Sequence, residues 1–200
     1  MKVIIIKSTY HKKGMISQLV EEFIRGIKKG NNKADIEIFD LLEKEINFCK
    51  GCYNCQKNPK LKIGKCVIND EMIKLLPRII ESDIVVFATP VYDYGPTALM
   101  KRFIERCYPL VCGGGFPVPR NKKIRNKKGI MILSTGCPSF INEITSMNNY
   151  SRFIFKKMFK WIGCAKNYFF IAGGMERNEK TKKKFLKKSY ELGIKVAKNG

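Results

Sequence analysis

The chain has 200 residues, of which 44% are hydrophobic. These values exclude a largely disordered protein, because a chain of this length and composition can bury the core of one domain without disulfides. The formal net charge is +22, but 31 of the 39 basic residues are lysines spread along the chain. Arginine is the favoured residue for bidentate recognition of bases and phosphates, so we interpret the charge as a solvated surface and expect no specific nucleic-acid partner.

The first residues of the chain, from Met1 to Ile6, contain an apolar run that is too short for a signal peptide and is expected to form a buried strand. No stretch approaches the roughly 20 apolar residues of a membrane span. We therefore expect a cytoplasmic protein with no membrane partner. In that reducing compartment the eight cysteines are expected to be thiols or metal ligands rather than disulfides.

Apolar residues follow two alternating patterns along the chain. Short, continuous apolar runs predict strands at residues 3–6, 34–38, 83–88, 129–133 and 168–172. Apolar residues at helical spacing predict helices at residues 15–27, 72–80, 96–104, 147–163 and 179–198. Asn69 or Asp70 is expected to cap the second of these helices, which contains Pro77.

Buried strands separated by helices indicate a parallel sheet that is covered on both faces. The predicted fold class is therefore α/β: a flavodoxin-like three-layer sandwich with a five-stranded parallel sheet of order 2-1-3-4-5 and helices on both faces. Residues 1–200 show no linker or internal repeat, so we expect a single domain. Two segments depart from the alternation, a cysteine-rich insertion at residues 49–66 and a long loop at residues 108–128.

Ligands of an open parallel sheet bind beyond the carboxyl ends of its strands, where the strand order reverses. Three loops meet this condition. The first offers hydroxyls, a glycine and helix N-terminal amides to a phosphate, the second offers aromatic rings to a planar group, and the third lets the backbone approach a ligand. The alternative for these loops is structural, with hydroxyls that cap a helix and tyrosines that cover the core. The candidate cofactor-binding residues are Ser8, Thr9, Tyr10, Gly14, Met15, Ile16 and Ser17 in the first loop, Thr89, Pro90, Val91, Tyr92, Asp93, Tyr94 and Gly95 in the second, and Ser134, Thr135, Gly136 and Cys137 in the third.

With these loops in order, the chain resembles the flavodoxin-like NAD(P)H-dependent FMN reductases, especially the branch that includes the iron–sulfur flavoproteins. The resemblance is carried by CKGCYNC at 49–55, GKC at 64–66, NDEM at 69–72, SDIV at 82–85, TPVY at 89–92 and LMKRFIER at 99–106. It implies FMN, with Ser8, Thr9 and residues 14–17 at the phosphate and residues 90–95 and 134–137 along the isoalloxazine. It also implies a homodimer or homotetramer. The family usually has Gly-Asn-Thr where this chain has Gly14-Met15-Ile16, and Ser17 is the candidate replacement.

Cys49, Cys52, Cys55 and Cys66 follow one another with spacers of two, two and ten residues. Two successive CxxC steps bring thiolates close enough for one metal centre, and such compact runs are typical of [4Fe–4S] sites. The same four thiolates could hold zinc, or they could belong to a loop beside the flavin that binds no metal. In the iron–sulfur flavoproteins the fourth cysteine usually follows sooner. Elsewhere, Cys107 and Cys164 are expected to be small core residues.

The residues and the resemblance together predict an FMN-dependent oxidoreductase. It would take electrons from NAD(P)H and pass them to a flavin, a quinone, a small electrophile or an iron–sulfur centre. No catalytic residue is assigned, because the flavin carries the chemistry. The expected partners are a nicotinamide nucleotide and a small-molecule or protein acceptor. The alternative is a non-enzymatic FMN electron-transfer protein, with or without a [4Fe–4S] cluster, that works with a ferredoxin-like partner.

Overall fold

The first strand, β1 (Lys2–Lys7), carries four consecutive apolar residues that are all buried in the computed structural model, which describes residues 1–113, 117–121, 124–138, 141 and 148–198. Successive side chains of a strand point to opposite faces of the sheet. Val3 and Ile5 accordingly belong to one hydrophobic cluster, and Ile4 and Ile6 belong to a second. The continuous apolar run is therefore explained by a sheet that is covered on both faces.

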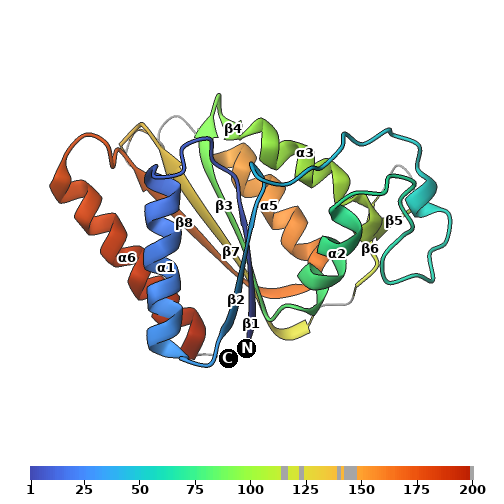
Figure 1. Cartoon of the computed structure of the whole chain (residues 1–200), viewed down its shortest axis with the longest axis horizontal. Helices are drawn as coiled ribbons and strands as arrows, with labels where there is room; N and C mark the ends of the chain where they lie inside the picture. The colour runs from blue at the N-terminus through green and yellow to red at the C-terminus, as the bar shows by residue number, and fades with distance from the viewer. Residues whose placement is uncertain (114–116, 122–123, 139–140, 142–147, 199–200) are drawn as a thin grey trace.

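The sheet grows outward from β1. This strand pairs in parallel with β2 (Asp35–Asp40) on one side and with β3 (Ile84–Tyr92) on the other. Beyond β3 lie β7 (Ile124–Thr135) and β8 (Cys164–Gly173), which also pair in parallel. The order β2-β1-β3-β7-β8 confirms the predicted order 2-1-3-4-5 (Figure 1). The order reverses between β1 and β3, so the carboxyl ends of these strands mark the expected ligand-binding edge.

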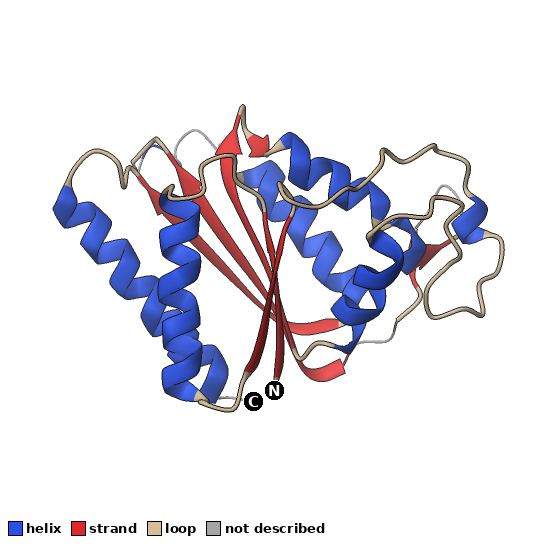
Figure 2. Ribbon diagram, in the orientation of Figure 1, coloured by secondary structure: helices blue, strands red, loops and turns tan. Residues whose placement is uncertain are grey.

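Helices cover both faces of the sheet (Figure 2). One face carries α1 (Met15–Gly30) and α6 (Glu179–Lys198), and the other carries α2 (Met72–Glu81), α3 (Ala98–Arg106) and α5 (Asn149–Ile162). The predicted α/β sandwich is confirmed by this arrangement. None of the helices within the described residues has the length and apolar character needed to cross a membrane.

The helices α1 and α6 cross at very short distance because glycines stand at the crossing. A Cβ atom on Gly26 would lie 2.0 Å from the carbonyl oxygen of Tyr190, and one on Gly193 would lie 2.2 Å from that of Phe23. Real Cβ atoms do not approach backbone this closely, so both positions require glycine for the helices to pack as they do.

Two buried lysines stand near the start of β7, in a segment that was expected to be a loop. Lys127 Nζ donates to the carbonyl oxygens of Ile79 and Ile80 at 2.8 and 2.6 Å, at the end of α2. Lys128 Nζ donates to the carbonyl oxygen of Val196 at 2.6 Å, at the end of α6. Each ammonium group thus satisfies free carbonyls at a helix C-terminus. Burial lowers the pKa of Lys127 to about 8 and also lowers the pKa of Lys128.

Short elements occupy much of the segment 108–128. They are the 3-10 turn η2 (Tyr108–Leu110) and the hairpin strands β5 (Val111–Cys112) and β6 (Val118–Pro119), followed by the first residues of β7. Residues 114–116 and 122–123 of this segment, which include two of its three consecutive glycines, lie outside the described residues. The hairpin lies beside the cysteine-rich insertion, which has one short turn of its own, η1 (Asn54–Gln56).

Candidate functional site

Three buried hydroxyl groups link the first two predicted loops to α3. The hydroxyls of Ser8 and Thr97 are hydrogen-bonded to each other, and the hydroxyl of Thr89 accepts from the backbone N–H of Thr97 at 3.3 Å. Thr97 also caps α3, since its hydroxyl accepts from the backbone N–H of Met100 at 3.2 Å. The ends of β1 and β3 are thereby fixed to the start of one helix, and the Ser8 hydroxyl is already engaged inside the fold.

The first turn of α1 presents hydrogen-bond donors that the fold leaves unused. Gly14 occupies the N-cap position and offers no side-chain cap, so the backbone N–H groups of Met15, Ile16 and Ser17 have no helical acceptor. A Cβ atom on Gly14 would lie 2.9 Å from the Cβ of His11, which explains the glycine. The hydroxyl of Ser17 is buried and makes no hydrogen bond within the described residues. Unpaired amides and an unpaired hydroxyl at a helix N-terminus suit an anion.

A cavity of about 450 Å³ lies at the carboxyl edge of the sheet, beside this turn. Its volume falls within the range of small-molecule and cofactor pockets. All three predicted loops contribute to its lining, through Thr9, Gly14, Met15, Ile16, Pro90, Val91, Tyr92, Ser134, Thr135 and Gly136. The other candidate residues do not line it, namely Ser8, Tyr10, Ser17, Thr89, Asp93, Tyr94, Gly95 and Cys137. The structure thus brings the three loops together at one cavity, with His11 also on its wall.

The second loop is a tight hairpin between β3 and the short strand β4 (Gly95–Pro96). Its two central residues, Asp93 and Tyr94, have positive φ angles of 46° and 62°, as a type I′ turn requires. Residues other than glycine rarely adopt a positive φ angle, and those that do concentrate at ligand sites. The turn leaves the ring of Tyr92 half exposed and nearly parallel to that of Tyr10, with interplanar angle 11° and centroids 6.1 Å apart. An aromatic rim therefore stands beside the cavity.

Two residues of the cavity wall were not predicted from the sequence. Met175 and Glu176 follow β8 and line the cavity together with the three predicted loops. Met175 is buried, whereas Glu176 is exposed. The signal was available, because β8 is parallel to β7 and its carboxyl end must reach the same edge. The pair Gly173-Gly174 marks the turn there, and Gly174 has a φ of 67°.

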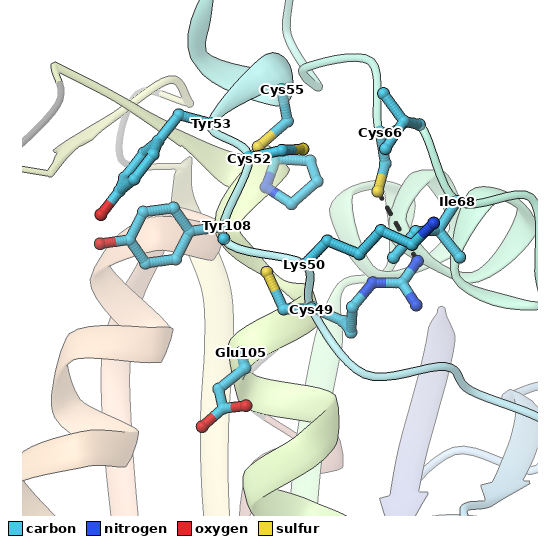
Figure 3. A pocket seen from close by; sticks show the side chains of 13 residues that line it. Cys49, Lys50, Cys52, Tyr53, Cys55, Cys66, Ile68, Glu105 and Tyr108 are labelled. Carbon is cyan, nitrogen blue, oxygen red and sulfur yellow. Dashed lines mark hydrogen bonds between the residues drawn. The ribbon is translucent and has the colours of Figure 1, made fainter.

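The four clustered cysteines surround a second cavity, of about 300 Å³ (Figure 3). Cys49 and Cys52 are exposed, and Cys55 and Cys66 are half-buried. Burial, followed by the proximity of the other three thiols, raises the pKa of Cys55. Among the described residues, no three His, Cys, Asp or Glu side chains are arranged closely enough to hold a metal ion. The four thiols thus line one cavity but are not close enough to one another to ligate a single ion, although four thiolates are the kind of donor set that binds a [4Fe–4S] cluster.

Arg120, at the end of the β5–β6 hairpin, holds the cysteine-rich insertion in place. Its guanidinium donates to four backbone carbonyl oxygens, those of Cys55 at 2.8 Å, Asn58 at 2.6 Å, Leu61 at 3.1 Å and Val111 at 2.9 Å. Gly64 packs against the same region, since a Cβ there would lie 1.8 Å from the carbonyl oxygen of Cys55. Three of these carbonyls belong to the insertion, so Arg120 fixes from outside a segment whose own secondary structure is the short turn η1.

The remaining cysteines do not line the second cavity. Cys107 and Cys164 are buried in the core, as predicted. Burial raises the pKa of Cys164 to about 12 and raises the pKa of Cys107 further. Both are therefore thiols at physiological pH and unsuited to nucleophilic or metal-binding roles.

Residues 1–148 match the model of a protein family described as NADPH-dependent FMN reductase. The chain belongs to this family. The matched residues include the three loops of the first cavity and all four clustered cysteines, so the resemblance seen in the sequence is confirmed. The enzyme class of the FMN reductase family also agrees with the predicted class.

Named relatives of this FMN reductase family member include two iron–sulfur flavoproteins. One, from Archaeoglobus fulgidus, is 35% identical over 109 residues, which are 54% of this chain and 46% of the relative. The other, from Methanocaldococcus jannaschii, is 32% identical over 129 residues, which are 64% of this chain and 59% of the relative. The chain therefore spans about half the length of the curated relatives it matches.

Solved structures of similar fold cover the chain almost completely. An NAD(P)H:quinone oxidoreductase from Methanothermobacter marburgensis superposes with a TM-score of 0.76 at 15% identity, over 98% of this chain and 96% of the other. An FMN-dependent NADH-azoreductase from Bacillus anthracis, solved in complex with FMN, gives 0.74 at 14% identity, over 98% and 99%. At these identities the likeness establishes the flavodoxin-like fold of the FMN reductase family member.

Proposed function

We propose that the protein is an FMN-dependent oxidoreductase that takes electrons from NAD(P)H and passes them to a flavin, a quinone, a small electrophile or an iron–sulfur centre. One observation carries this proposal. The cavity of about 450 Å³ is lined by all three predicted loops and lies beside a helix start with unpaired donors. This is the place where doubly wound sheets bind their ligands.

The phosphate of FMN would bind at the first turn of α1. Met15 and Ile16 replace the polar residues usual in the family, so they can contribute only their backbone N–H groups. The Ile16 side chain is in fact buried in the core. Ser17 supplies the one unpaired side-chain donor of the turn. The cradle proposed here therefore depends on backbone amides, the helix dipole and one serine hydroxyl.

The isoalloxazine ring would lie between the second and third loops. Pro90 and Val91 provide an apolar wall, and Gly136 leaves open space above the third loop, since no atom lies within 4 Å of a Cβ placed there. The stacked pair of Tyr10 and Tyr92 forms the rim and would limit access of water to one side of the ring. When bound, FMN supplies the chemistry, by accepting hydride and releasing electrons singly or in pairs.

A [4Fe–4S] cluster held by Cys49, Cys52, Cys55 and Cys66 is the second part of the proposal. Its support is the gathering of the four thiols around one cavity, together with the name that the two relatives from archaea share. The cluster would supply one-electron transfer. Zinc at the same thiols is the competing possibility, and metal analysis separates the two.

The experiment is anaerobic purification followed by flavin, iron and sulfide analysis and by stopped-flow mixing with NADH and with NADPH. We expect one FMN per chain and rapid bleaching of the flavin absorbance by at least one nicotinamide nucleotide. Flavin that binds but is bleached by neither nucleotide would refute the reductase and favour the electron-transfer protein with a ferredoxin-like partner. Protein that binds no FMN would refute both, and protein with full flavin turnover but no iron or sulfide would refute a catalytic cluster.

A further inference from the structure

Cys66 stands apart from the other three clustered cysteines in the sequence. The CxxCxxC run places Cys49, Cys52 and Cys55 within seven residues, whereas ten residues separate Cys55 from Cys66. Arg120 holds the backbone of this spacer at Cys55, Asn58 and Leu61. The sulfur of Cys66 has a separate contact of its own from outside the spacer.

That contact comes from Arg106, the last residue of α3. Its Nη2 atom lies 3.7 Å from the sulfur of Cys66 in hydrogen-bonding geometry, and Figure 3 shows the contact as a dashed line. Arg106 is only 2% exposed although it lines the cavity. It therefore presents a fixed, desolvated positive charge to one of the four thiols.

Arg106 is itself held by hydrogen bonds to two residues, Asp70 and Asn47. Both terminal nitrogens of its guanidinium donate to the carboxylate of Asp70, with Nη2 at 2.9 Å from Oδ1, and Nη1 also donates to the carbonyl oxygen of Asn47 at 2.8 Å. Asp70 in turn accepts from the backbone N–H groups of Asn47 at 2.9 Å and Met72 at 3.1 Å. Asn47 precedes the cysteine-rich insertion and Asp70 follows it. The contacts of Arg106 with Asn47 and Asp70 thus join the two ends of the insertion, and this junction is its neck.

We infer that Arg106 is a positioning residue for the metal centre: it holds the Cys66 sulfur at the cavity that the other three thiols line and donates an N–H···S hydrogen bond to it. This inference rests on the proposed metal centre. Partners of this kind orient metal ligands, and hydrogen bonds to the sulfurs set the reduction potential of an iron–sulfur cluster. A donor and a positive charge beside the sulfur favour the reduced, more negative form of the cluster. Loss of Arg106 therefore lowers its midpoint potential.

The test compares R106K, which keeps the charge but loses the planar fork, with the double variant R106M/D70N, which leaves no unpaired charge in the neck. C66S shows the effect of losing the fourth ligand, and R78M is the matched control, because Arg78 pairs with Glu37 at the surface instead. FMN binding by each variant reports that the domain is folded. The two readouts are release of iron from the anaerobically reconstituted protein to a chelator and the midpoint potential from an EPR-monitored titration.

We expect iron release to be roughly 10- to 100-fold faster in R106K and in the double variant than in wild type. The midpoint potential should fall in the double variant, which loses both the donor and the positive charge, and should fall less in R106K, which keeps the charge; R78M should match wild type. Co²⁺ added to the metal-free protein gives a count of thiolate ligands that does not depend on a cluster. That count should be four in wild type and three in both C66S and the double variant.

Each remaining outcome overturns a defined statement. Arg106 variants that match wild type in iron release, midpoint potential and Co²⁺ ligation would overturn the role of Arg106 while leaving the metal centre intact. Wild-type protein that takes up neither a cluster nor Co²⁺ at four thiolates would overturn the metal centre and this role together. Failure of NADH and NADPH to bleach the flavin would overturn the reductase alone, because it leaves these metal readouts unaffected.

Discussion

Replacement of Ser17 by alanine tests two consequences of its buried, unpaired hydroxyl. One is the stability that the hydroxyl costs the FMN-free protein, and the other is the affinity that it contributes to FMN binding. The hydroxyl lies in the first turn of α1, is buried, and makes no hydrogen bond within the described residues. Burial of an unpaired polar group costs about 1–3 kcal/mol, and a hydrogen bond to a charged group contributes about 1.5–3 kcal/mol. Ser17→Ala should therefore leave the FMN-free protein as stable as wild type or more stable by about 1 kcal/mol. It should also weaken FMN binding roughly 10- to 150-fold.

Two ligands and one control variant make this result specific to the phosphate. The dissociation constants of FMN and of riboflavin, which lacks the phosphate, are measured by fluorescence titration, and stability is measured by urea unfolding without flavin. The loss of affinity should appear for FMN and be absent for riboflavin. Ser82→Ala is the control, because the Ser82 hydroxyl is buried but already donates to the carbonyl oxygen of Arg78 at 2.7 Å. FMN affinity of Ser17→Ala within about twofold of wild type would refute the reasoning, since even a weak bond to a charged group exceeds that change.

Other substitutions test the packing and electrostatics that position the two cavities. Gly26→Ala places a Cβ 2.0 Å from the backbone oxygen of Tyr190. The free energy of unfolding in urea should therefore fall by about 1–3 kcal/mol. An unchanged unfolding midpoint would contradict the close crossing of α1 and α6. The pKa of Lys127 is about 8 in the folded protein, whereas an exposed lysine has a pKa of 10.5. Between pH 8 and pH 10.5 the unfolded chain therefore binds one more proton at this residue than the folded protein does. The free energy of unfolding should therefore rise from pH 8 to 10.5, and Lys127→Met should reduce that rise in pH-dependent urea titrations. Arg120→Met frees four backbone carbonyls, so trypsin should cut the lysine-rich stretch 57–65 faster, whereas a wild-type digestion rate would show that Arg120 does not hold the insertion.

The fold follows from features that are local in the sequence. The apolar run of β1 and the run at residues 84–88 of β3 can be buried only if both faces of the sheet are covered, and their alternation with helices implies parallel pairing. The early start of β7 could not be predicted in this way. Lys127 and Lys128 are typical of a surface loop, and only the distant carbonyls at the ends of α2 and α6 give their ammonium groups partners inside the protein.

The β3–β4 hairpin is a second feature that could not be predicted from the sequence, and its turn residues explain why. The β3–β4 hairpin needs two central residues with positive φ, for which Asn-Gly and Asp-Gly are the usual signals. The chain has Asp93 and Tyr94 there, and Tyr94 is an unusual residue at such a position. Its conformation depends on the pairing of the flanking residues rather than on its own preference. The loop itself could be predicted as a site because it follows a buried strand, but its shape could not.

The side chains that organise the two cavities are the hardest to predict, because they act over long separations in the chain. Thr97 contacts Ser8 across 89 positions, and Arg120 contacts the carbonyl oxygen of Cys55 across 65. Neither residue belongs to a motif. Arg106 lies within a stretch that resembles the family, yet nothing in its neighbours indicates a contact with a cysteine.

The helix α3 joins the two cavities and makes their separation a property of the fold. Thr97, at its start, is bonded to the loops that line the proposed flavin cavity, and Arg106, its last residue, lines the cysteine cavity. Nine helical residues span about 13 Å. Buried hydrogen bonds fix both ends, so this distance is set before any cofactor binds. The cysteine-rich insertion is therefore no independent appendage, because the helix that begins at the flavin loops also closes its neck. A shift of α3 would alter both cavities at once, whereas Ser17→Ala, on α1, should alter only one.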